Sequence, residues 1–342
     1  MEVILLYKKR KKLNVIYFSI FSIILIVAFI TSLLVGRYKI SLSDFGNMLI
    51  SKDGYETEKS IVVNLRLPRT LLALLTGMAL SVSGILYQDT FQNKLVSPDL
   101  LGVSSGAGVG AAIAILLGLS SMFVSTLAFL FGVLTVLATL FVSKAFQNKS
   151  SVMLTLSGII VGGCMSAVLS LIKYLADAET TLSSITFWLM GSFEQATMQD
   201  VYILFPIVLI CCTIIFVIRW RINIVALGRE EAQTKGINYD AYRLLIIVVA
   251  TMLTASSVSF AGTISWIGLV IPHIVRLIVG RDSSGTLPMS MLLGSIFMIF
   301  ADILSRTFTA SEIPLSAITG LFGTVIFVII LFVRRSTIHE NY

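Results

Sequence analysis

Long uncharged apolar runs recur along the whole chain and are separated by short charged segments. The mean hydropathy is +0.96 and only 13% of the residues are charged, which excludes an ordinary soluble domain. A bilayer core about 30 Å thick needs roughly 20 apolar residues of helix. A membrane barrel would instead show alternating strands of about 10 residues. The runs therefore predict an all-α, polytopic membrane helical bundle.

The apolar runs predict about ten transmembrane helices in one domain over residues 1–342. Lys and Arg favour the segments predicted to lie inside by about two to one, which places both termini in the cytoplasm. Residues 36–60 and 177–200 are predicted to be external. The runs lie at 13–35, 62–88, two between 100 and 142 with a break at 118–121, 151–175, 201–218, 244–260, 261–280 (broken by glycine and proline), 287–305 and 314–333.

The longest charged stretch in the body of the chain, residues 219–243, lies between two apolar halves. Residues 226–236 can form a short helix, because Glu230 and Glu231 suit its positive N-terminal end and Gly236 suits its stop. A polar helix cannot lie in lipid, so it is expected to project into water, where another protein can push on it. An ordinary cytoplasmic loop is the alternative.

Several chemistries are disfavoured by what the sequence lacks. The net charge is +7, but the Lys and Arg residues gather between apolar runs, as in cytoplasmic loops, so nucleic acid is not an expected partner. Cys164, Cys211 and Cys212 lie in apolar runs and have no metal-ligand spacing. The chain has no Gly-Lys dipeptide and hence no P-loop. No catalytic constellation and no metal or cofactor site is predicted.

Charges inside the predicted spans are few. Asp302 and Arg306 are one helical turn apart, which fits an ion pair as well as a functional role. An ion-coupled carrier is expected to have more buried carboxylates, and a membrane enzyme a clustered polar site. A pore moved by an external motor fits better, although both alternatives stay open on composition.

Glycines at four-residue spacing mark one predicted span, at Gly102, Gly106 and Gly110, and recur at Gly158 and Gly162. Close helix packing is the favoured interpretation. The halves could form an inverted repeat, because residues 81–84 (SVSG) are faintly echoed at residues 259–262 (SFAG), each near a predicted helix end.

Four segments resemble one transport family: residues 66–108, 226–238, 261–280 and 301–323. They are similar to FecCD-type permeases, the membrane subunits of binding-protein-dependent ABC importers for iron–siderophore complexes, haem and cobalamin. The resemblance covers nearly the whole chain in the family's order. It implies a type II ABC importer permease fold in the cytoplasmic membrane, and an iron–siderophore as the first choice of substrate, with haem or cobalamin as alternatives.

The resemblance also implies the partners. A second permease subunit, either another copy or a paralogue, forms the path. A separate ATPase subunit binds ATP-Mg and grips the coupling segment at residues 226–238, so this chain is not itself an enzyme. A substrate-binding lipoprotein docks outside.

The resemblance implies residue roles as well. Arg66, Arg69 and Arg306 match outer arginines that pair with acidic residues of the binding protein, and helix-end packing is their alternative role. Asn93 and Leu95 match a cytoplasmic gate turn, although Lys94 replaces the family's usual proline there. Gly102 and Gly106 are further candidates for the gate or path. The ATPase-coupling motif matches Ala226, Leu227, Gly228, Glu230, Ala232 and Gly236.

Overall fold

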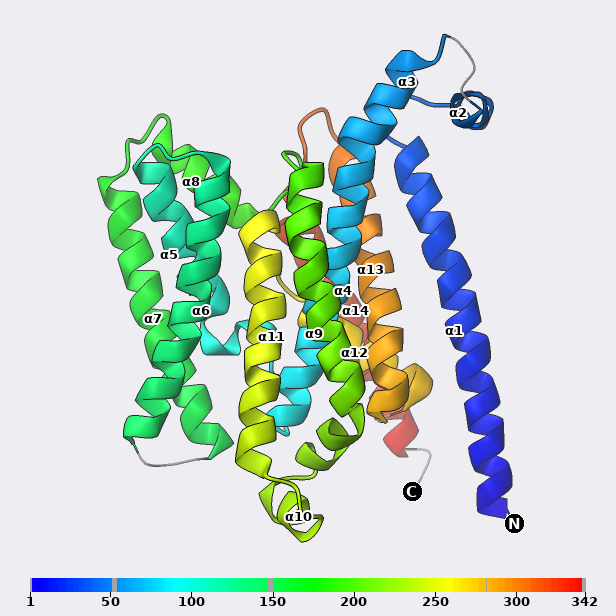
Figure 1. Cartoon of the computed structure of the whole chain (residues 1–342), viewed down its shortest axis with the longest axis vertical. Coiled ribbons are helices and arrows are strands. Elements are labelled where there is room, and N and C mark those ends of the chain that lie inside the picture. The colour runs from blue at the N-terminus through cyan, green and yellow to red at the C-terminus, as the bar shows by residue number, and fades with distance from the viewer. Residues whose placement is uncertain (1, 51–53, 147–149, 281, 340–342) are drawn as a thin grey trace.

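Helix α4 (Leu67–Thr90) lies at the centre of a helical bundle, where α9, α11, α12 and α13 pack around it (Figure 1). Within its apolar span, 83% of the residues are buried inside the protein, against 0% for α1. Small residues make this packing possible: Gly77 faces the backbone of Gly294 on α13, and Gly84 faces that of Gly268 on α12. Helix α4 is therefore surrounded by protein, whereas α1 presents its sides to lipid.

The computed structural model describes residues 2–50, 54–146, 150–280 and 282–339, and no strand occurs in these ranges. The elements are α1 (Glu2–Leu34), α2 (Leu42–Leu49), α3 (Glu56–Ser60), a wide helical turn η1 (Ile61–Arg66), α4, a tight turn η2 (Pro98–Leu101), α5 (Val103–Leu116), α6 (Ser121–Ala145), α7 (Ser151–Leu175), α8 (Thr181–Met190), α9 (Met198–Val225), α10 (Arg229–Thr234), α11 (Tyr239–Ala261), α12 (Ile267–Val279), α13 (Ser283–Thr307) and α14 (Leu315–His339).

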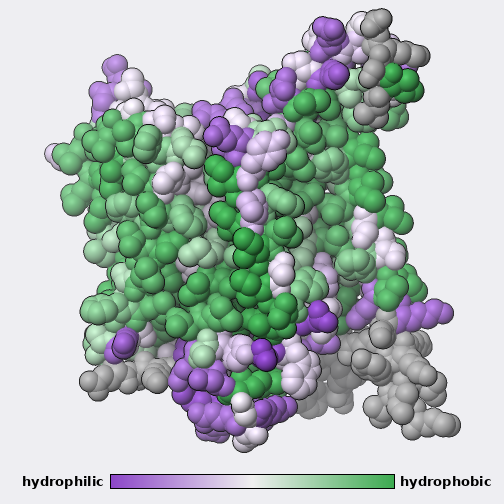
Figure 2. Space-filling view, viewed as in Figure 1, coloured by the Kyte–Doolittle hydropathy of each residue, from purple (hydrophilic) through white to green (hydrophobic). Residues whose placement is uncertain are grey.

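Among the described residues, 8 helices are long and apolar enough to cross a membrane. The shorter apolar helices α5 and α12 complete the predicted set of spans. The prediction of an all-α polytopic membrane bundle is confirmed. Figure 2 shows a broad apolar band between two hydrophilic ends, as a bilayer requires.

Helices α5 and α12 are too short to cross a bilayer alone. They have 14 and 13 residues, or about 20 Å each at 1.5 Å per residue, against a core of about 30 Å. The segments before them, residues 97–102 and 262–266, therefore continue inside the bundle as irregular backbone. Backbone of this kind is tolerated at membrane depth only where protein or a water-filled cavity satisfies its polar groups.

The structure corrects two sequence predictions. Helix α9 ends at Val225 and not near residue 218, because Ile218, Ile222 and Val225 continue its buried stripe while Arg219 and Arg221 point outward. Residues 36–60 are not only a loop, since they hold α2, capped by Ser41 and Asp44, and the helical turns that lead into α4. The two echoed motifs lie where the sequence placed them, because SVSG falls in the C-terminal half of α4 and SFAG ends α11.

The two ends of the bundle carry different elements. Helix α10, the start of α1 and the end of α14 lie at one end, whereas α2, α3 and α8 lie at the other (Figure 1). We refer to these as the α10 end and the α8 end. The predicted inner and outer segments therefore fall on opposite sides of the apolar band.

Candidate functional site

The predicted coupling segment forms a short helix that projects from the α10 end (Figure 1). Helix α10 covers Arg229–Thr234 and is shorter than the helix predicted over residues 226–236. Gly228, directly before α10, has φ 109°, and Gly236, just after α10, has φ 71°. Both values lie in the left-handed region, which residues with side chains disfavour. Ala232 is fully buried, whereas Glu230 and Leu227 (56% exposed) face outward. The motif thus gives an anchored helix with an exposed acidic and apolar surface.

An ion pair that the sequence reasoning missed fastens α10 to α11. Arg229 donates to both carboxylate oxygens of Asp240 at 3.0 and 2.5 Å, and its guanidinium lies 5.1 Å from the centre of the Tyr239 ring. The hydrogen bonds from Arg229 to Asp240 raise the pKa of this guanidinium, so it stays charged. The sequence signal for this ion pair was an arginine at the start of a helix that a glycine ends, with an aspartate shortly after that glycine.

The predicted gate turn lies directly beside the coupling segment. Gln92 donates from Nε2 to the Ala226 carbonyl at 3.2 Å, and a Cβ on Gly228 would lie 2.8 Å from the same nitrogen. Gln92 itself has φ 53°, a strained value for a residue other than glycine. Asn93 and Leu95 are exposed at the tip, where Asn93 Oδ1 accepts from the Leu95 amide at 2.9 Å. The turn is therefore well braced despite Lys94.

A buried polar cluster joins the gate turn to α12. Arg276 pairs with Asp89 at 2.8 Å and also donates to the Gln88 side-chain oxygen. Gln88 in turn donates to the carbonyls of Val96 and Gly268, at 3.2 and 3.3 Å. Three segments distant in sequence, the end of α4, the gate turn and α12, are thus held together at the α10 end.

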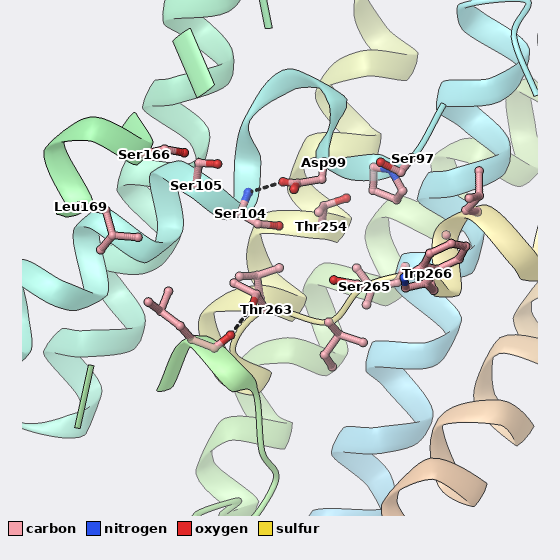
Figure 3. A pocket seen from close by; sticks show the side chains of 17 residues that line it. Ser97, Asp99, Ser104, Ser105, Ser166, Leu169, Thr254, Thr263, Ser265 and Trp266 are labelled. Carbon is pink, nitrogen blue, oxygen red and sulfur yellow. Dashed lines mark hydrogen bonds between the residues drawn. The ribbon is translucent and has the colours of Figure 1, made fainter. Parts of the chain in front are cut away.

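The two irregular segments meet at a cavity of about 410 Å³, shown in Figure 3. Its walls come from η2, α5, α7, α11 and the loop before α12, and they carry many hydroxyl groups. The polar members include Asp99, Ser104, Ser105, Ser166, Thr254 and Ser265. Trp266 borders the cavity at φ 71°, a left-handed conformation that is unusual for a bulky residue and typical of functional sites.

Asp99 is the acidic group in the cavity wall. Its Oδ1 accepts a hydrogen bond from the Ser104 amide at 2.9 Å, at the start of α5 (Figure 3). No Lys, Arg or His is found among the described residues of the wall. Asp99 is an exposed residue in the wall of this cavity, and an acidic residue between membrane spans in such a place is a candidate for function. The wall suits neutral or positively charged groups that form hydrogen bonds.

The two glycines predicted for the gate or path are engaged in helix packing. A side chain at Gly106 would clash with Thr135 and the Phe131 carbonyl of α6, and a Cβ at Gly102 would lie 3.1 Å from both Thr135 on α6 and Gly162 on α7. The two predicted glycines are buried, whereas Ser104 and Ser105 between them line the cavity. These contacts fit the packing interpretation, and a role in the path stays a prediction for Gly102 and Gly106.

The three predicted docking arginines gather near the α8 end, but they are buried. Arg66 donates to the carbonyls of Leu33, Leu34 and Tyr38. Arg306 donates to the Ser32 carbonyl at 2.7 Å.

Arg69 is the most heavily paired of the three. It bonds Asp302 at 2.6 Å and Glu312 at 2.7 and 2.8 Å. The contacts of all three arginines in this structure are those of the alternative helix-end role, and docking stays a prediction.

The architecture is that of a membrane permease of the type II ABC importer class. Among solved structures, one described as an inward-facing conformation of a metal-chelate type ABC transporter aligns with TM-score 0.84 and 34% identity, over 92% of this chain and 98% of that one. A structure of PsaBC from Streptococcus pneumoniae, at 14% identity and TM-score 0.60, shares the fold.

The FecCD transport family profile matches residues 24–333, and the chain belongs to this family. It is 36% identical to the molybdate import system permease protein of Haemophilus influenzae, over 93% of this chain and 96% of that protein. It is 34% identical to a Helicobacter pylori protein described as an iron chelatin transport system permease, over 91% and 96%. The vitamin B12 import permease of Citrobacter koseri is also 34% identical, over 96% and 97%.

The chain is therefore a multi-pass ABC importer permease of the cell membrane. Membership of this family excludes the ion-coupled carrier that the composition alone had left open. Its relatives carry cargoes of different chemistry, so the family by itself leaves the cargo open.

Proposed function

We propose that this chain imports an iron–siderophore complex that is neutral or positively charged. The supporting observation is the chemistry of the cavity between α5, α7, α11 and α12. Its hydroxyl groups can bind a polar chelate, while Asp99 disfavours a free oxyanion. Two like charges about 5 Å apart at an effective dielectric constant near 20 repel by about 3 kcal/mol.

In this proposal the α10 end faces the cytoplasm and the α8 end faces outward. A separate ATPase subunit binds ATP-Mg and contacts the coupling segment through exposed Leu227 and Glu230, while buried Ala232 anchors α10 to the bundle and Gly228 and Gly236 form its bends. A second permease subunit completes the path. A substrate-binding lipoprotein delivers the cargo at the α8 end. Asn93 and Leu95 form the gate that α10 moves.

Gln92 explains how such a motion reaches the gate. It bonds the Ala226 carbonyl directly and belongs to the turn that holds Asn93 and Leu95. The same turn is tied to α12 through Gln88 and Arg276. A shift of α10 therefore moves the gate turn and the cavity wall together.

Uptake in cells that lack the gene tests this function. Labelled ferric siderophores, haem, cobalamin and molybdate are supplied in parallel, and the gene is restored as wild type or as Asp99→Asn. We expect loss of one ferric siderophore class, rescued by the wild-type gene. Loss of cobalamin or haem uptake instead would select the alternative cargo, and loss of molybdate uptake would refute the argument from Asp99.

A further inference from the structure

A groove of about 770 Å³ lies along α9, apart from the cavity of Figure 3. Helix α9 supplies most of its wall, and it packs directly on α4 and α13, which supply the rest (Figure 1). The members from α4 and α13 are Leu74, Leu75, Met78 and Met291. Two small side chains, Cys212 and Thr213, lie along α9 between the larger Phe205 and Phe216. The helix surface is hollow there because the small side chains leave space between the larger ones.

The groove opens toward the membrane. Phe205, Leu209 and Val217 line it and are exposed. From Phe205 to Trp220 the wall extends for about 22 Å at 1.5 Å per residue, whereas one leaflet of the bilayer core is about 15 Å thick. The groove is therefore long enough for an acyl chain, and an acyl chain restores the van der Waals contacts that an empty apolar groove lacks.

The groove ends in a cation and an aromatic ring near the α10 end. Arg219 is the one charged residue in the described wall, and it is exposed. Its guanidinium lies 5.7 Å from the centre of the Phe216 ring, which is also part of the wall. Trp220 is 70% exposed, and tryptophan is enriched at the depth where acyl chains meet headgroups. The end of the groove thus has the chemistry of a headgroup site.

Arg219 has no carboxylate partner among the described residues. Its Nη1 donates to the Phe216 carbonyl at 3.4 Å, which is a long hydrogen bond. Asp282, at the start of α13, is bonded instead to the Asn223 side chain at 2.8 Å and to the Ser284 amide at 3.1 Å. A guanidinium has five N–H donors, so most of those on Arg219 are available to an external anion.

Arg221, two residues further along α9, lies on the other side of the helix. Successive residues turn by about 100°, so these two arginines are about 200° apart. The Arg221 guanidinium lies 5.0 Å from the centre of the Tyr242 ring on α11, and Arg221 is not part of the groove wall. The two arginines therefore add the same charge to the α10 end, but of the two only Arg219 lines the groove.

We propose that this groove is a binding site for an anionic phospholipid. One acyl chain lies along α9, and the phosphate of the headgroup pairs with Arg219 beside Trp220. Arginine binds phosphate oxygens through two parallel N–H donors. A zwitterionic headgroup carries its own ammonium group, which cancels part of this attraction, so the site distinguishes lipids by their net charge.

The site lies close to the coupling segment. Arg219 is about two helical turns before Ala226. Asn223, one turn after Arg219, ties the end of α9 to the start of α13, because its side chain also accepts from the Ser283 amide at 2.9 Å. A lipid in the groove contacts α4, α9 and α13 together, and so it braces the helix from which the coupling segment starts. The inference goes beyond the proposed function, since it requires only that the chain spans a membrane.

Tryptophan fluorescence tests which lipids enter the groove. The purified full-length permease is placed in nanodiscs of phosphatidylcholine with a varied fraction of lipid that carries bromine on its acyl chains, because bromine quenches tryptophan on contact. The chain has 3 tryptophans, so the signal of Trp220 is the difference between wild type and Trp220→Phe. We expect brominated phosphatidylglycerol to quench Trp220 with about fivefold higher apparent affinity than brominated phosphatidylcholine, the factor that one arginine near an anionic surface contributes.

Two arginine variants separate the groove from general surface charge. Arg219→Gln removes the charge at the groove, and Arg221→Gln, the matched control, removes the same charge from the same end. We expect Arg219→Gln to make the two apparent affinities equal, whereas Arg221→Gln keeps the fivefold preference. If wild type were quenched equally by both lipids, the groove would hold only ordinary surrounding lipid and the proposal would be wrong. An equal loss of preference in the two variants would also overturn it.

Thr213→Phe tests whether the acyl chain lies in the groove. Thr213 is exposed, and a phenylalanine there fills the hollow while Arg219 stays in place. We expect the apparent affinity for phosphatidylglycerol to fall at least threefold, with an elution volume in size exclusion equal to that of wild type. An unchanged affinity would show that no acyl chain occupies the groove. Since these measurements use no cargo, their failure would leave the proposed function standing, and failure of the uptake assay would leave the lipid site standing.

Discussion

The two ends of the bundle hold their charged motifs in opposite ways. At the α10 end, Glu230 and Leu227 are exposed on a helix bounded by two glycines in left-handed conformations. At the α8 end, Arg66, Arg69 and Arg306 are buried and engaged inside the chain. The coupling helix at the α10 end is accessible at the surface, whereas the arginines at the α8 end are bound by groups of the same chain.

The difference follows from how closely other parts of the chain surround each motif. Helix α10 has 6 residues and packs mainly on α9 and α11, and most of its residues in the described structure are exposed. The arginines sit at the junction of α1, α4 and α13, where carbonyls and carboxylates surround them. The coupling segment is thus accessible to another protein, whereas the arginines are engaged within the chain.

The largest effect is expected at the buried end. Arg69→Ala leaves Asp302 and Glu312 without their main partner, and breaking a buried ion pair typically costs about 3–5 kcal/mol. We expect a strong fall in the melting temperature of the purified subunit, followed by fluorescence-detected size exclusion after heating. Arg37→Ala, an exposed arginine at the same end, should leave it unchanged. Equal melting temperatures would mean that the cluster is not structurally important.

The second effect tests the exposed end. Gly228→Val forces a β-branched residue into φ 109° and brings a side chain against Gln92, at a cost on the order of 1–3 kcal/mol. We expect loss of uptake through displacement of α10. Gly236→Asn is the matched control, because asparagine tolerates left-handed backbone better, and it should retain most uptake. If both variants transported normally, the shape of α10 would not matter for coupling.

The sequence predicted the fold more fully than the site. Apolar runs fixed the spans because a bilayer sets their length, and glycine spacing predicted the contacts of Gly106 and Gly158. The end of α9 was misplaced because Arg219 and Arg221 read as a boundary, although their neighbours continue a buried stripe. Charge alone does not tell which face of a helix carries it.

The site could not be completed from sequence because its parts meet only in space. Asp302 and Arg306 were recognised as neighbours one turn apart, but Arg69 lies on α4 and Glu312 on the loop before α14. In the same way Asp99 and Ser265 belong to distant segments that share one cavity. Local spacing cannot reveal pairs that only tertiary packing creates.

A smaller effect on stability, but a clear one on transport, is expected at Gln92. Gln92→Gly removes the hydrogen bond to the Ala226 carbonyl, which contributes about 1 kcal/mol to stability. It also relieves the backbone strain of φ 53°, which offsets this loss by a similar amount. We expect an unchanged melting temperature with fewer cargo molecules imported per ATP hydrolysed by the reconstituted complex. Transport at the wild-type ratio would show that α10 acts on the gate without this link.

The smallest effect concerns the partly exposed pair that fastens α10 to α11. Arg229→Lys keeps the charge but loses the two-pronged contact with Asp240, and exposed pairs contribute only about 0.2–1 kcal/mol. We expect a slight fall in melting temperature that 1 M salt largely removes, because salt screens exposed charges. The buried arginine cluster should behave differently. Raising the salt should hardly change the fall in melting temperature caused by Arg69→Ala, since the ion pairs of Arg69 are buried. Comparing both variants at low and high salt therefore tests directly whether burial distinguishes the two ends.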